Sequence, residues 1–412
     1  MSILISCVGD TDPIRNRHDG PLLHIARNIK PDKIVLIHSE RTVEKHDQLV
    51  QAIQAIPDYQ TEIIIEPTIL KNSEIFFFDK MFDTLDRIIQ KYAQQEEEIL
   101  LNLSSATPQV ISAMFTINRI NDLNVRAFQV TTPVESSNEG VKHDNQIDIL
   151  ERIKTNQDNQ REFTSRMIED RAEKFQKNLL KRTVRDLVER YNYEAALEII
   201  TKNKNILRTK DEAGECRRKL EAIVKSVQTQ KRLPEVEMTN YYDQEKTILN
   251  GYLILELQAK RQLTTEVLIR AKNFAEYIAE MYLEKHHTTV IVRRDDKPYL
   301  NPEGNDELIQ FLETDSKKSQ KTFNIDFYLS LPLYIRIFRF LEPNSQILTL
   351  LHKIEGVNYL RNRVAHGFQE VDSKKIRNLN KVCKELLQLT IEADDKWFTF
   401  YKDFNEELLC YI

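Results

Sequence analysis

The sequence is poor in glycine, and the glycine-rich phosphate-binding motifs of common nucleotide enzymes are missing. Only 8 of its 412 residues are glycine. Neither a G-x-G-x-x-G fingerprint nor a P-loop with its lysine occurs. The sequence therefore disfavours a dinucleotide-dependent oxidoreductase and a P-loop ATPase.

Cysteine, long apolar runs and excess positive charge are also scarce. The four cysteines, which are Cys7, Cys216, Cys383 and Cys410, are scattered. They form no C-x-x-C pair and have no histidine at ligand spacing, which predicts a reduced, intracellular chain without a structural zinc. No apolar run approaches a membrane span, and no basic leader precedes the apolar start Ile3–Val8. The net charge of -5 excludes a global basic field for nucleic acid. We expect a cytoplasmic protein with neither a metal nor a membrane partner.

Short apolar runs alternate with helical patterns in the N-terminal third of the chain. Most of these runs are apolar throughout, as strands covered on both faces are. The predicted strands are Ile3–Val8, Lys33–His38, Glu62–Glu66, Ile99–Leu103 and Val125–Val130, and the predicted helices are Pro21–Ile29, Arg41–Ala55, Phe76–Tyr92 and Pro108–Ile120. This order predicts a doubly wound, Rossmann-like α/β domain.

After Pro133 the pattern becomes helical. The polar stretch Pro133–Gly140 is the clearest break, and no further proline occurs before Pro234. The predicted helices cover roughly 161–191, 193–203, 211–230, 244–284 with a break near Arg261, a segment that starts near 305, 328–341, 345–366 and 373–392, and a hairpin or loop insertion is predicted around 288–304. We therefore predict an α/β domain over residues 1–146 and an all-α domain over residues 147–412.

Polar residues follow two of the predicted strands. The first strand leads into Gly9-Asp10-Thr11-Asp12-Pro13, and the fourth leads into Asn102-Leu103-Ser104-Ser105-Ala106-Thr107-Pro108. Ligands of such sheets bind beyond the carboxyl ends of the strands, and free N–H groups at a helix start attract anions. Ordinary helix capping explains Thr107 and Pro108, but it does not explain the amide and the serines before them. These loops favour a ligand with phosphates and nucleobases, held without a metal.

A second candidate site lies near the C-terminus, at the end of the helical pattern over 345–366. Arg361 occupies a position on the apolar stripe where the spacing calls for leucine, and an unpaired buried charge is costly. Asn362 stands four residues before His366, and Gly367 is the expected helix stop. A guanidinium, an amide and an imidazole at this spacing suit phosphate chemistry. The pattern is short, however, and Arg41 and His46 repeat its spacing without the adjacent asparagine or glycine.

Taken together, these motifs resemble the CARF–HEPN ancillary ribonucleases of type III-A CRISPR systems. The resemblance rests on Gly9–Pro13 with Asp19-Gly20-Pro21-Leu22-Leu23-His24-Ile25, on the Asn102–Pro108 loop, and on Arg361-Asn362-x-x-Ala365-His366. It covers the order and the approximate size of both domains. Each motif is weak alone, but their order and placement are specific.

The resemblance implies a homodimer whose CARF domains bind a cyclic oligoadenylate and whose HEPN domains form one composite RNase site. Arg361 and His366 are then catalytic, with Asn362 in support. The implied ligand-binding residues are Gly9, Asp10, Thr11, Asp12, Ser39, Asn102, Ser104, Ser105 and Thr107. Relatives often carry glycine where this chain has Ala106. Similarity to the shorter, Gram-positive-type members favours cyclic hexa-adenylate over the tetra-adenylate.

The function implied by the resemblance is a cyclic-oligoadenylate-activated, metal-independent endoribonuclease that cuts single-stranded RNA in type III CRISPR antiviral defence. The ribose 2′-OH would attack the adjacent phosphate and leave a 2′,3′-cyclic phosphate. A non-enzymatic nucleotide-sensing regulator is the first alternative. The second is a ring nuclease, in which the α/β domain degrades its own activator with Thr107 or neighbouring hydroxyls positioning the 2′-OH.

Overall fold

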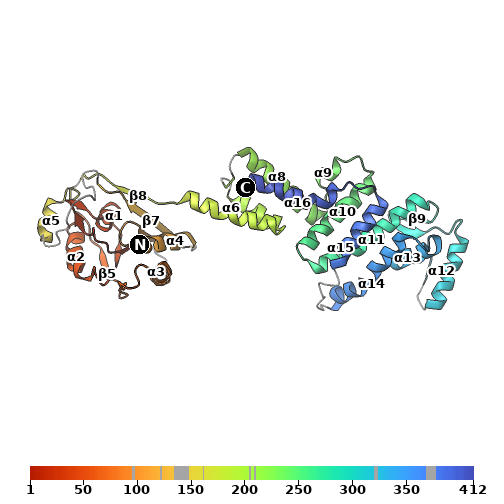
Figure 1. The fold of residues 1–412 in the computed structure, drawn as a ribbon, viewed down its shortest axis with the longest axis horizontal. Helices are drawn as coiled ribbons and strands as arrows, with labels where there is room; N and C mark the ends of the chain where they lie inside the picture. Colours follow the sequence, from red (N-terminus) through yellow and green to blue (C-terminus); the bar gives the residue numbers. More distant parts are fainter. Residues whose placement is uncertain are drawn as a thin grey trace. The chain divides into compact units, whose positions relative to one another are not determined.

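The computed structural model of the chain describes residues 1–94, 98–120, 123–133, 148–160, 162–203, 206–207, 210–319, 323–367 and 377–412. It divides into two compact units, Met1–Gln176 and Lys177–Ile412 (Figure 1). The division that the sequence suggests, after residue 146, falls outside the described residues.

A mostly parallel sheet forms the centre of the first unit. In the described residues its strands are β1 (Ser2–Cys7), β4 (Lys33–Ile37), β5 (Glu62–Ile65), β6 (Glu98–Asn102), β7 (Val125–Val130) and β8 (Met167–Glu169). They are ordered β5-β4-β1-β6-β7-β8, and only the β7–β8 pair is antiparallel. The five predicted strands are confirmed. Their apolar residues point to both faces of the sheet, as the side-chain period of two requires.

Helices cover both faces of this sheet. They are α1 (Pro21–Ile29), the short η1 (Val43–Lys45), α2 (His46–Gln54), α3 (Phe78–Ala93), α4 (Pro108–Ile120) and α5 (Ile149–Thr155). Ile5 of β1 shares one buried cluster with Leu85 of α3 and Met114 of α4. The next residue towards the N-terminus, Leu4, shares the opposite cluster with Ile25 of α1. The predicted doubly wound α/β fold is therefore confirmed. A small hairpin that the sequence did not predict, β2 (Ile14–Arg15) with β3 (His18–Asp19), connects β1 to α1.

The predicted helix over residues 161–191 is wrong in its first part. Residues 167–169 form strand β8, which pairs with Val130, Gln129 and Phe128 of β7. The helix α6 begins only at Glu173 and ends at Glu189. A strand of three residues carries no periodicity of its own, so its conformation depends on a partner that is distant in the sequence. The first unit consequently includes this strand and runs to Gln176.

The second unit is mostly helical. Beyond α6, its elements are α7 (Tyr193–Lys202), α8 (Lys210–Thr229), α9 (Pro234–Glu237), α10 (Asp243–Lys260), α11 (Thr264–His286), the hairpin β9 (Ile291–Arg294) and β10 (Lys297–Leu300), α12 (Asp306–Ser319), α13 (Leu331–Leu341), α14 (Gln346–Gly367), α15 (Arg377–Thr390) and α16 (Lys396–Tyr411). The predicted break near Arg261 is confirmed, because α10 ends at Lys260 and Gln262 takes a positive φ of 58°. The predicted hairpin is confirmed as well.

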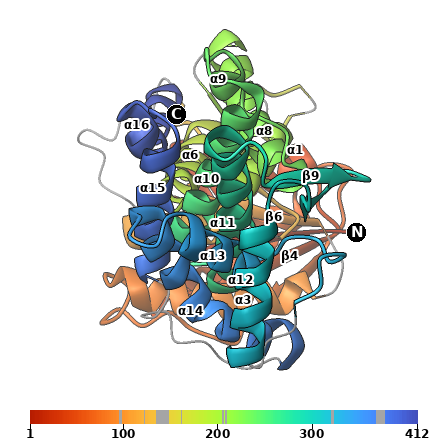
Figure 2. The same ribbon diagram turned by 90° about the vertical axis from the view of Figure 1, so that its right-hand side faces the viewer.

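The long helix α11 is central to the second unit. It packs against α10, α13, α14 and α15, among which it lies in Figure 2. The shared apolar core includes Ile278 of α11, Leu351 and Ile354 of α14, and Leu386 of α15. This packing fixes the direction of α14, the helix that carries the C-terminal candidate motif. In the part of the chain that the structure describes, no helix has both the length and the apolarity to cross a bilayer.

Candidate functional site

The loops that follow β1 and β6 lie against each other at the carboxyl ends of these neighbouring strands. Gly9 is buried there, and a Cβ atom added to it would lie 2.9 Å from the backbone nitrogen of Ala106 and 3.3 Å from the Cα of Ser105. Any larger residue at position 9 would push the two loops apart. The two polar strand ends found in the sequence thus form one surface.

Asp12 fixes the first of these loops from within. Its carboxylate accepts hydrogen bonds from the backbone N–H of Gly9 at 2.9 Å and of Leu22 at 3.1 Å, so it ties the loop to the start of α1. Burial raises the pKa of Asp12, although these backbone bonds, a hydrogen bond from Ser105 and the charge of Lys45 oppose the increase. Both carboxylate oxygens are used internally. Asp12 therefore determines the shape of the loop.

Asn102 has the same internal role in the second loop. Its side chain is fully buried, and Nδ2 donates to Ser6 Oγ at 2.9 Å and to Ser105 Oγ at 2.8 Å. Its Oδ1 accepts the backbone N–H of Ser104 at 2.9 Å. The hydroxyl of Ser104 in turn accepts the N–H of Val130, at the end of β7. One amide thus fixes both serines that the sequence identified.

Thr107 stands immediately before α4, as the sequence predicts, but its hydroxyl points away from the helix start. The backbone carbonyl of Thr107 accepts the first helical hydrogen bond, from Ile111 at 3.0 Å. Its Oγ1 donates to the carbonyl of Ile75 at 3.3 Å. Thr107 therefore links this loop to the segment before α3.

The other predicted residues lie around these loops. Asp10 is exposed, and its carboxylate pairs with Arg41 at 3.2 Å. Ser39 is buried after β4, where its backbone N–H and hydroxyl both contact Thr42 Oγ1. The second member of the sequence's alternative Arg–His pair, His46, contacts His38. Arg41 and His46 thus have separate partners within the first unit.

A pocket of about 220 Å³ opens beside these loops. Its walls include Thr11 and Ser104, which the sequence identified, and Arg15, His18 and Arg166, which it did not. Two guanidinium groups, an imidazole and two hydroxyls are suited to an anionic ligand with hydroxyl groups. The pocket lies beyond the carboxyl ends of parallel strands, where ligands of such folds bind.

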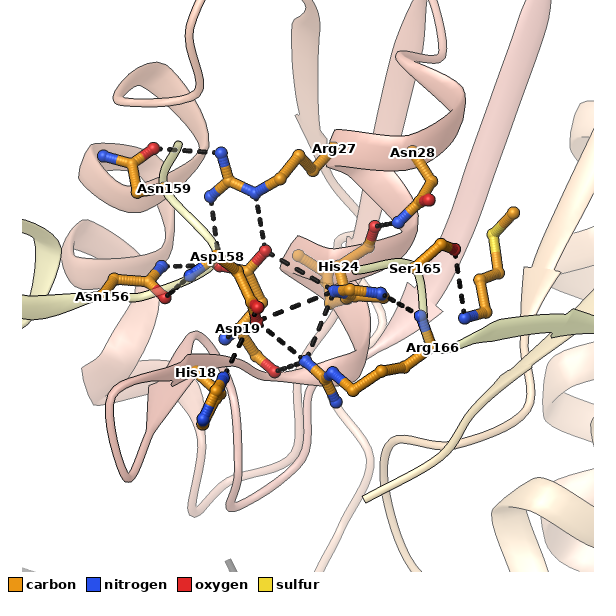
Figure 3. A network of polar contacts seen from close by, with 12 residues as sticks. His18, Asp19, His24, Arg27, Asn28, Asn156, Asp158, Asn159, Ser165 and Arg166 are labelled. Carbon is orange, nitrogen blue, oxygen red and sulfur yellow. Dashed lines mark hydrogen bonds and ion pairs between the residues drawn. The ribbon is translucent and has the colours of Figure 1, made fainter. Parts of the chain in front are cut away.

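A buried ion-pair network supports the wall of this pocket (Figure 3). The carboxylate of Asp19 accepts two hydrogen bonds from Arg27, at 2.7 and 3.1 Å, and one from Asn156 at 2.6 Å. Burial raises the pKa of Asp19, but hydrogen bonds from His24, Arg27 and Asn156 outweigh it and hold the pKa below its usual value. A depressed carboxyl pKa adds stability above the ordinary aspartate pKa, and this stability is lost as the pH falls.

Ligand atoms of Asp19, His24 and Asp158 lie within 4.8 Å of one another, which is close enough to suggest a metal site. The charges around them indicate otherwise. Arg27 lies against Asp19, and Arg166 donates to Asp158 at 2.9 Å, so two guanidinium groups already balance the two carboxylates. We therefore assign this group to the ion-pair network.

The C-terminal motif lies in the last turns of α14. Arg361, Asn362 and His366 are helical, and the described helix ends with Gly367, as the spacing in the sequence predicts. The side chains of these residues lie outside the described part of the structure. Leu360, directly before the motif, is buried in the core that α14 shares with α11 and α15.

Ala106 offers a direct test of the loop geometry. Its φ of 100° lies in the region that suits glycine, so Ala106→Gly should relieve strain and raise the free energy of unfolding by roughly 1 kcal/mol. Urea denaturation measures the change. The control Ala113→Gly, at a buried position within α4, should lower the stability by about 1 kcal/mol. A destabilised Ala106→Gly protein would contradict the described loop conformation.

Two family models match the chain. The Cas_Csm6 HEPN domain matches residues 236–409, which include all of α14, and the Cas_Csm6 CARF domain matches residues 60–167, which include the β6 loop. The two matched ranges lie in the order that the sequence motifs indicate.

The chain is similar over its whole length to curated proteins. It is 38% identical over 424 residues to the CRISPR system endoribonuclease Csm6 of Streptococcus thermophilus, with 99% of each chain covered. It is 28% identical over 442 residues to the protein of that name from Enterococcus italicus, again with 99% of each covered. The solved structure of Enterococcus italicus Csm6 bound to cyclic hexa-2′-fluoro-hexa-dAMP matches with a TM-score of 0.73, at 25% identity and with 100% of both chains covered.

Proposed function

Since this chain belongs to the Csm6 family of CRISPR endoribonucleases, we propose that its helical unit cleaves single-stranded RNA when a cyclic oligoadenylate occupies its α/β unit. One observation carries the proposal: the range that matches the HEPN domain includes helix α14, whose last turns hold Arg361, Asn362 and His366. Endoribonuclease relatives at full coverage favour an enzyme over a non-enzymatic regulator.

The proposed activator site is the pocket beside the β1 and β6 loops. Its cationic groups Arg15 and Arg166 suit phosphates, and the hydroxyls of Thr11 and Ser104 suit ribose. The related protein from Enterococcus italicus was solved with an analogue of cyclic hexa-adenylate, which supports the six-membered ring as the activator of this chain. A ring of six nucleotides is larger than one pocket of about 220 Å³, which supports binding by a homodimer.

The proposed chemistry needs only the side chains of α14 and the substrate. The ribose 2′-OH loses its proton and attacks phosphorus, the bond to the 5′-oxygen breaks, and that oxygen takes up a proton. His366 transfers these protons, either directly or through its copy in the partner subunit. Arg361 stabilises the charge that develops on the phosphate, and Asn362 orients the imidazole or the phosphate. The products are a 2′,3′-cyclic phosphate and a 5′-OH, and no metal takes part.

The proposed setting is the cytoplasm. All four cysteines are free thiols in the structure, and three of them are buried. Burial raises the pKa of Cys7 to about 12, so this thiol stays protonated and unreactive. Such a chain suits a reducing compartment, where RNA is also present.

The test is RNA cleavage by the full-length protein in EDTA, with and without cyclic tri-, tetra- and hexa-adenylate. We expect cleavage of a labelled single-stranded RNA to be stimulated most strongly by the hexa-adenylate. Absence of cleavage with every ring would overturn the proposed function, and stimulation by a smaller ring alone would overturn the assignment of ring size.

A 2′-deoxy substitution at the scissile nucleotide should block cutting at that position, because the 2′-OH is the nucleophile. The same RNA with the substitution at a neighbouring nucleotide is the control, and it should be cut normally. Gel electrophoresis of the products measures the cutting of both RNAs. Efficient cutting of the deoxy position, or loss of cutting in EDTA, would point to a metal-activated water as the nucleophile instead.

A further inference from the structure

Arg166 belongs both to the pocket and to the segment through which the chain leaves the first unit. It directly precedes β8, and its backbone N–H donates to His24 Nε2 at 2.9 Å. Its carbonyl accepts the backbone N–H of Thr131, just beyond β7. After β8 the chain enters α6, which continues into the second unit. A movement of Arg166 therefore affects the segment that connects the first unit to the second.

The guanidinium of Arg166 joins two residues that line the pocket, Thr131 and Asp19, to Asp158 behind the pocket wall. Figure 3 shows its contacts with Asp19 and Asp158. Its Nη1 donates to the carbonyl of Thr131 at 2.8 Å, and its Nη2 donates to the carbonyl of Asp19 and to Asp158 Oδ2, both at 2.9 Å. Its Nε is buried and finds no acceptor among the described residues. A buried donor without an acceptor is unfavourable, so this arrangement leaves part of the guanidinium's bonding capacity unused.

Asp158 is the acidic partner that a ligand would displace. A phosphate group is an anion that matches the guanidinium fork at least as well as a carboxylate does. If Arg166 turned towards a phosphate in the pocket, Asp158 would retain the backbone N–H of Asp19 at 2.8 Å and His18 Nδ1 at 3.4 Å. The exchange would therefore leave the buried carboxylate of Asp158 with a donor, which avoids the free-energy cost of an unpaired buried charge. The phosphate would replace the acceptors that the guanidinium gives up.

We propose that Arg166 senses the activator: a phosphate of the bound ring takes its guanidinium from Asp158, and this exchange shifts the start of β8. The inference rests on the proposed function, since it assigns a residue and a switch to the same activator site. The strand β8 has only three register pairs with β7, so little pairing opposes a displacement at its start. Arg166 is thus a ligand-binding residue that also positions the connection to the second unit.

Two substitutions should change the response to the activator in opposite directions. Arg166→Gln removes the charged donor, and we expect the half-maximal concentration of cyclic hexa-adenylate to rise at least about tenfold. Asp158→Asn removes the competing charge but keeps an acceptor for the backbone of Asp19, so the half-maximal concentration should fall by roughly threefold or more. The measurement is the RNase rate of the full-length protein against activator concentration. If Arg166→Gln does not fold, Arg166→Lys can replace it. This variant should raise the half-maximal activator concentration by less than the tenfold expected for Arg166→Gln.

Arg126→Gln is the matched control. Arg126 also connects β7 to β8, through Glu169 at 2.9 and 3.1 Å, and it contacts Glu98 on β6 at 3.2 Å. It lies near the other end of β7 and is not among the residues that line the pocket. We expect the half-maximal concentration of cyclic hexa-adenylate to be the same for Arg126→Gln as for the wild type. An increase as large as that of Arg166→Gln would show that only the anchoring of β8 matters, and would overturn the proposal.

The direction of the Asp158→Asn effect decides between a switch and a purely structural network. Loss of structure would raise the half-maximal concentration for both variants, and this result would overturn the inference while the wild type still responds to the ring. A wild-type protein that no cyclic oligoadenylate activates would instead overturn the proposed function itself. The two failures are therefore distinguishable in one set of titrations.

Discussion

The His366→Ala and Arg361→Ala proteins are each expected to cleave RNA at least about a thousandfold more slowly than the wild type. Removal of a general acid–base group typically costs between roughly a hundredfold and ten-thousandfold, and removal of the group that stabilises phosphate charge costs a similar factor. Both positions lie in the last turns of α14, whose earlier residues Leu351 and Ile354 are fixed in the core of the second unit. The rate of cleavage at saturating activator is the measurement.

His352→Ala is a matched control on the same helix. His352 is exposed and pairs with Glu355 at 3.5 Å, so its loss should leave the cleavage rate near that of the wild type. The affinity for cyclic hexa-adenylate, measured by calorimetry, should be the same in all three variants. Near-normal cleavage by either motif variant would remove this helix from the mechanism.

The Arg361→Ala variant also tests whether the catalytic site is shared between two subunits. In the proposed mechanism each chain supplies one copy of Arg361 and His366, so we expect two subunits to supply half of the catalytic groups each. Mixing Arg361→Ala subunits with wild-type subunits should lower the activity more than simple dilution. Activity in strict proportion to the wild-type fraction would show that each subunit cuts alone.

The Asn102→Ala, Thr107→Ala double variant is expected to need far more activator, with a half-maximal concentration raised by at least about a hundredfold. Asn102 makes three hydrogen bonds, to Ser6 of β1, to Ser105 and to the backbone of Ser104, and each buried bond contributes about 1 kcal/mol or more. A ligand shifts an equilibrium only by its differential affinity for the two states, so a disordered loop weakens activation directly. The rate without activator serves as the internal reference.

Thr116→Ala supplies the comparison for this variant. The hydroxyl of Thr116, on α4, donates to the carbonyl of Ser112 in the same helix, so its removal should not alter the titration. Thermal unfolding of both proteins separates loss of stability from loss of affinity. An unchanged half-maximal concentration in the double variant would exclude these loops from activator binding.

Much of the fold follows from local patterns in the sequence. The strands β1, β4 and β6 are mostly apolar because the helices on both faces exclude water, and such runs are recognisable without a structure. The break between α10 and α11 could also be predicted, since the apolar pattern pauses at Arg261. The strand β8 could not, because its three residues are ordered by pairing with β7 and not by their own periodicity.

The residues of the candidate site also fall into those that the sequence reveals and those that only the structure reveals. Thr11 and Ser104 are recognisable in the sequence because they lie in the loops that follow strands, and strand ends of a parallel sheet meet at one edge. Arg166 and Asp158 were missed because they come from a segment without a motif, far from β1 in the sequence. The sequence indicates that Asn102 and Asp12 lie at or just beyond strand ends, but it does not reveal that their polar atoms face inward.

One signal in the sequence pointed to the missing residues. His24 and Arg27 lie among the apolar residues of α1, and both are buried. Charged or polar side chains on the inner face of a helix require partners, and the hairpin before α1 supplies only Asp19. Further partners in the network are Asn156, Asp158, Asn159 and Arg166. A search for unpaired donors on α1 would have drawn attention to this segment.

The antiparallel strand β8 also determines how the first unit could be isolated. Phe128, Gln129 and Val130 of β7 pair with it, so β8 is the outermost strand of the sheet on that side. A fragment that ended at residue 146 would lack β8 and expose the backbone N–H and C=O groups of β7. Exposed strand edges add strands from other chains and lead to aggregation. In a fragment that extends to Gln176, β8 still covers the edge of β7. We therefore expect the shorter fragment, and not the longer one, to self-associate.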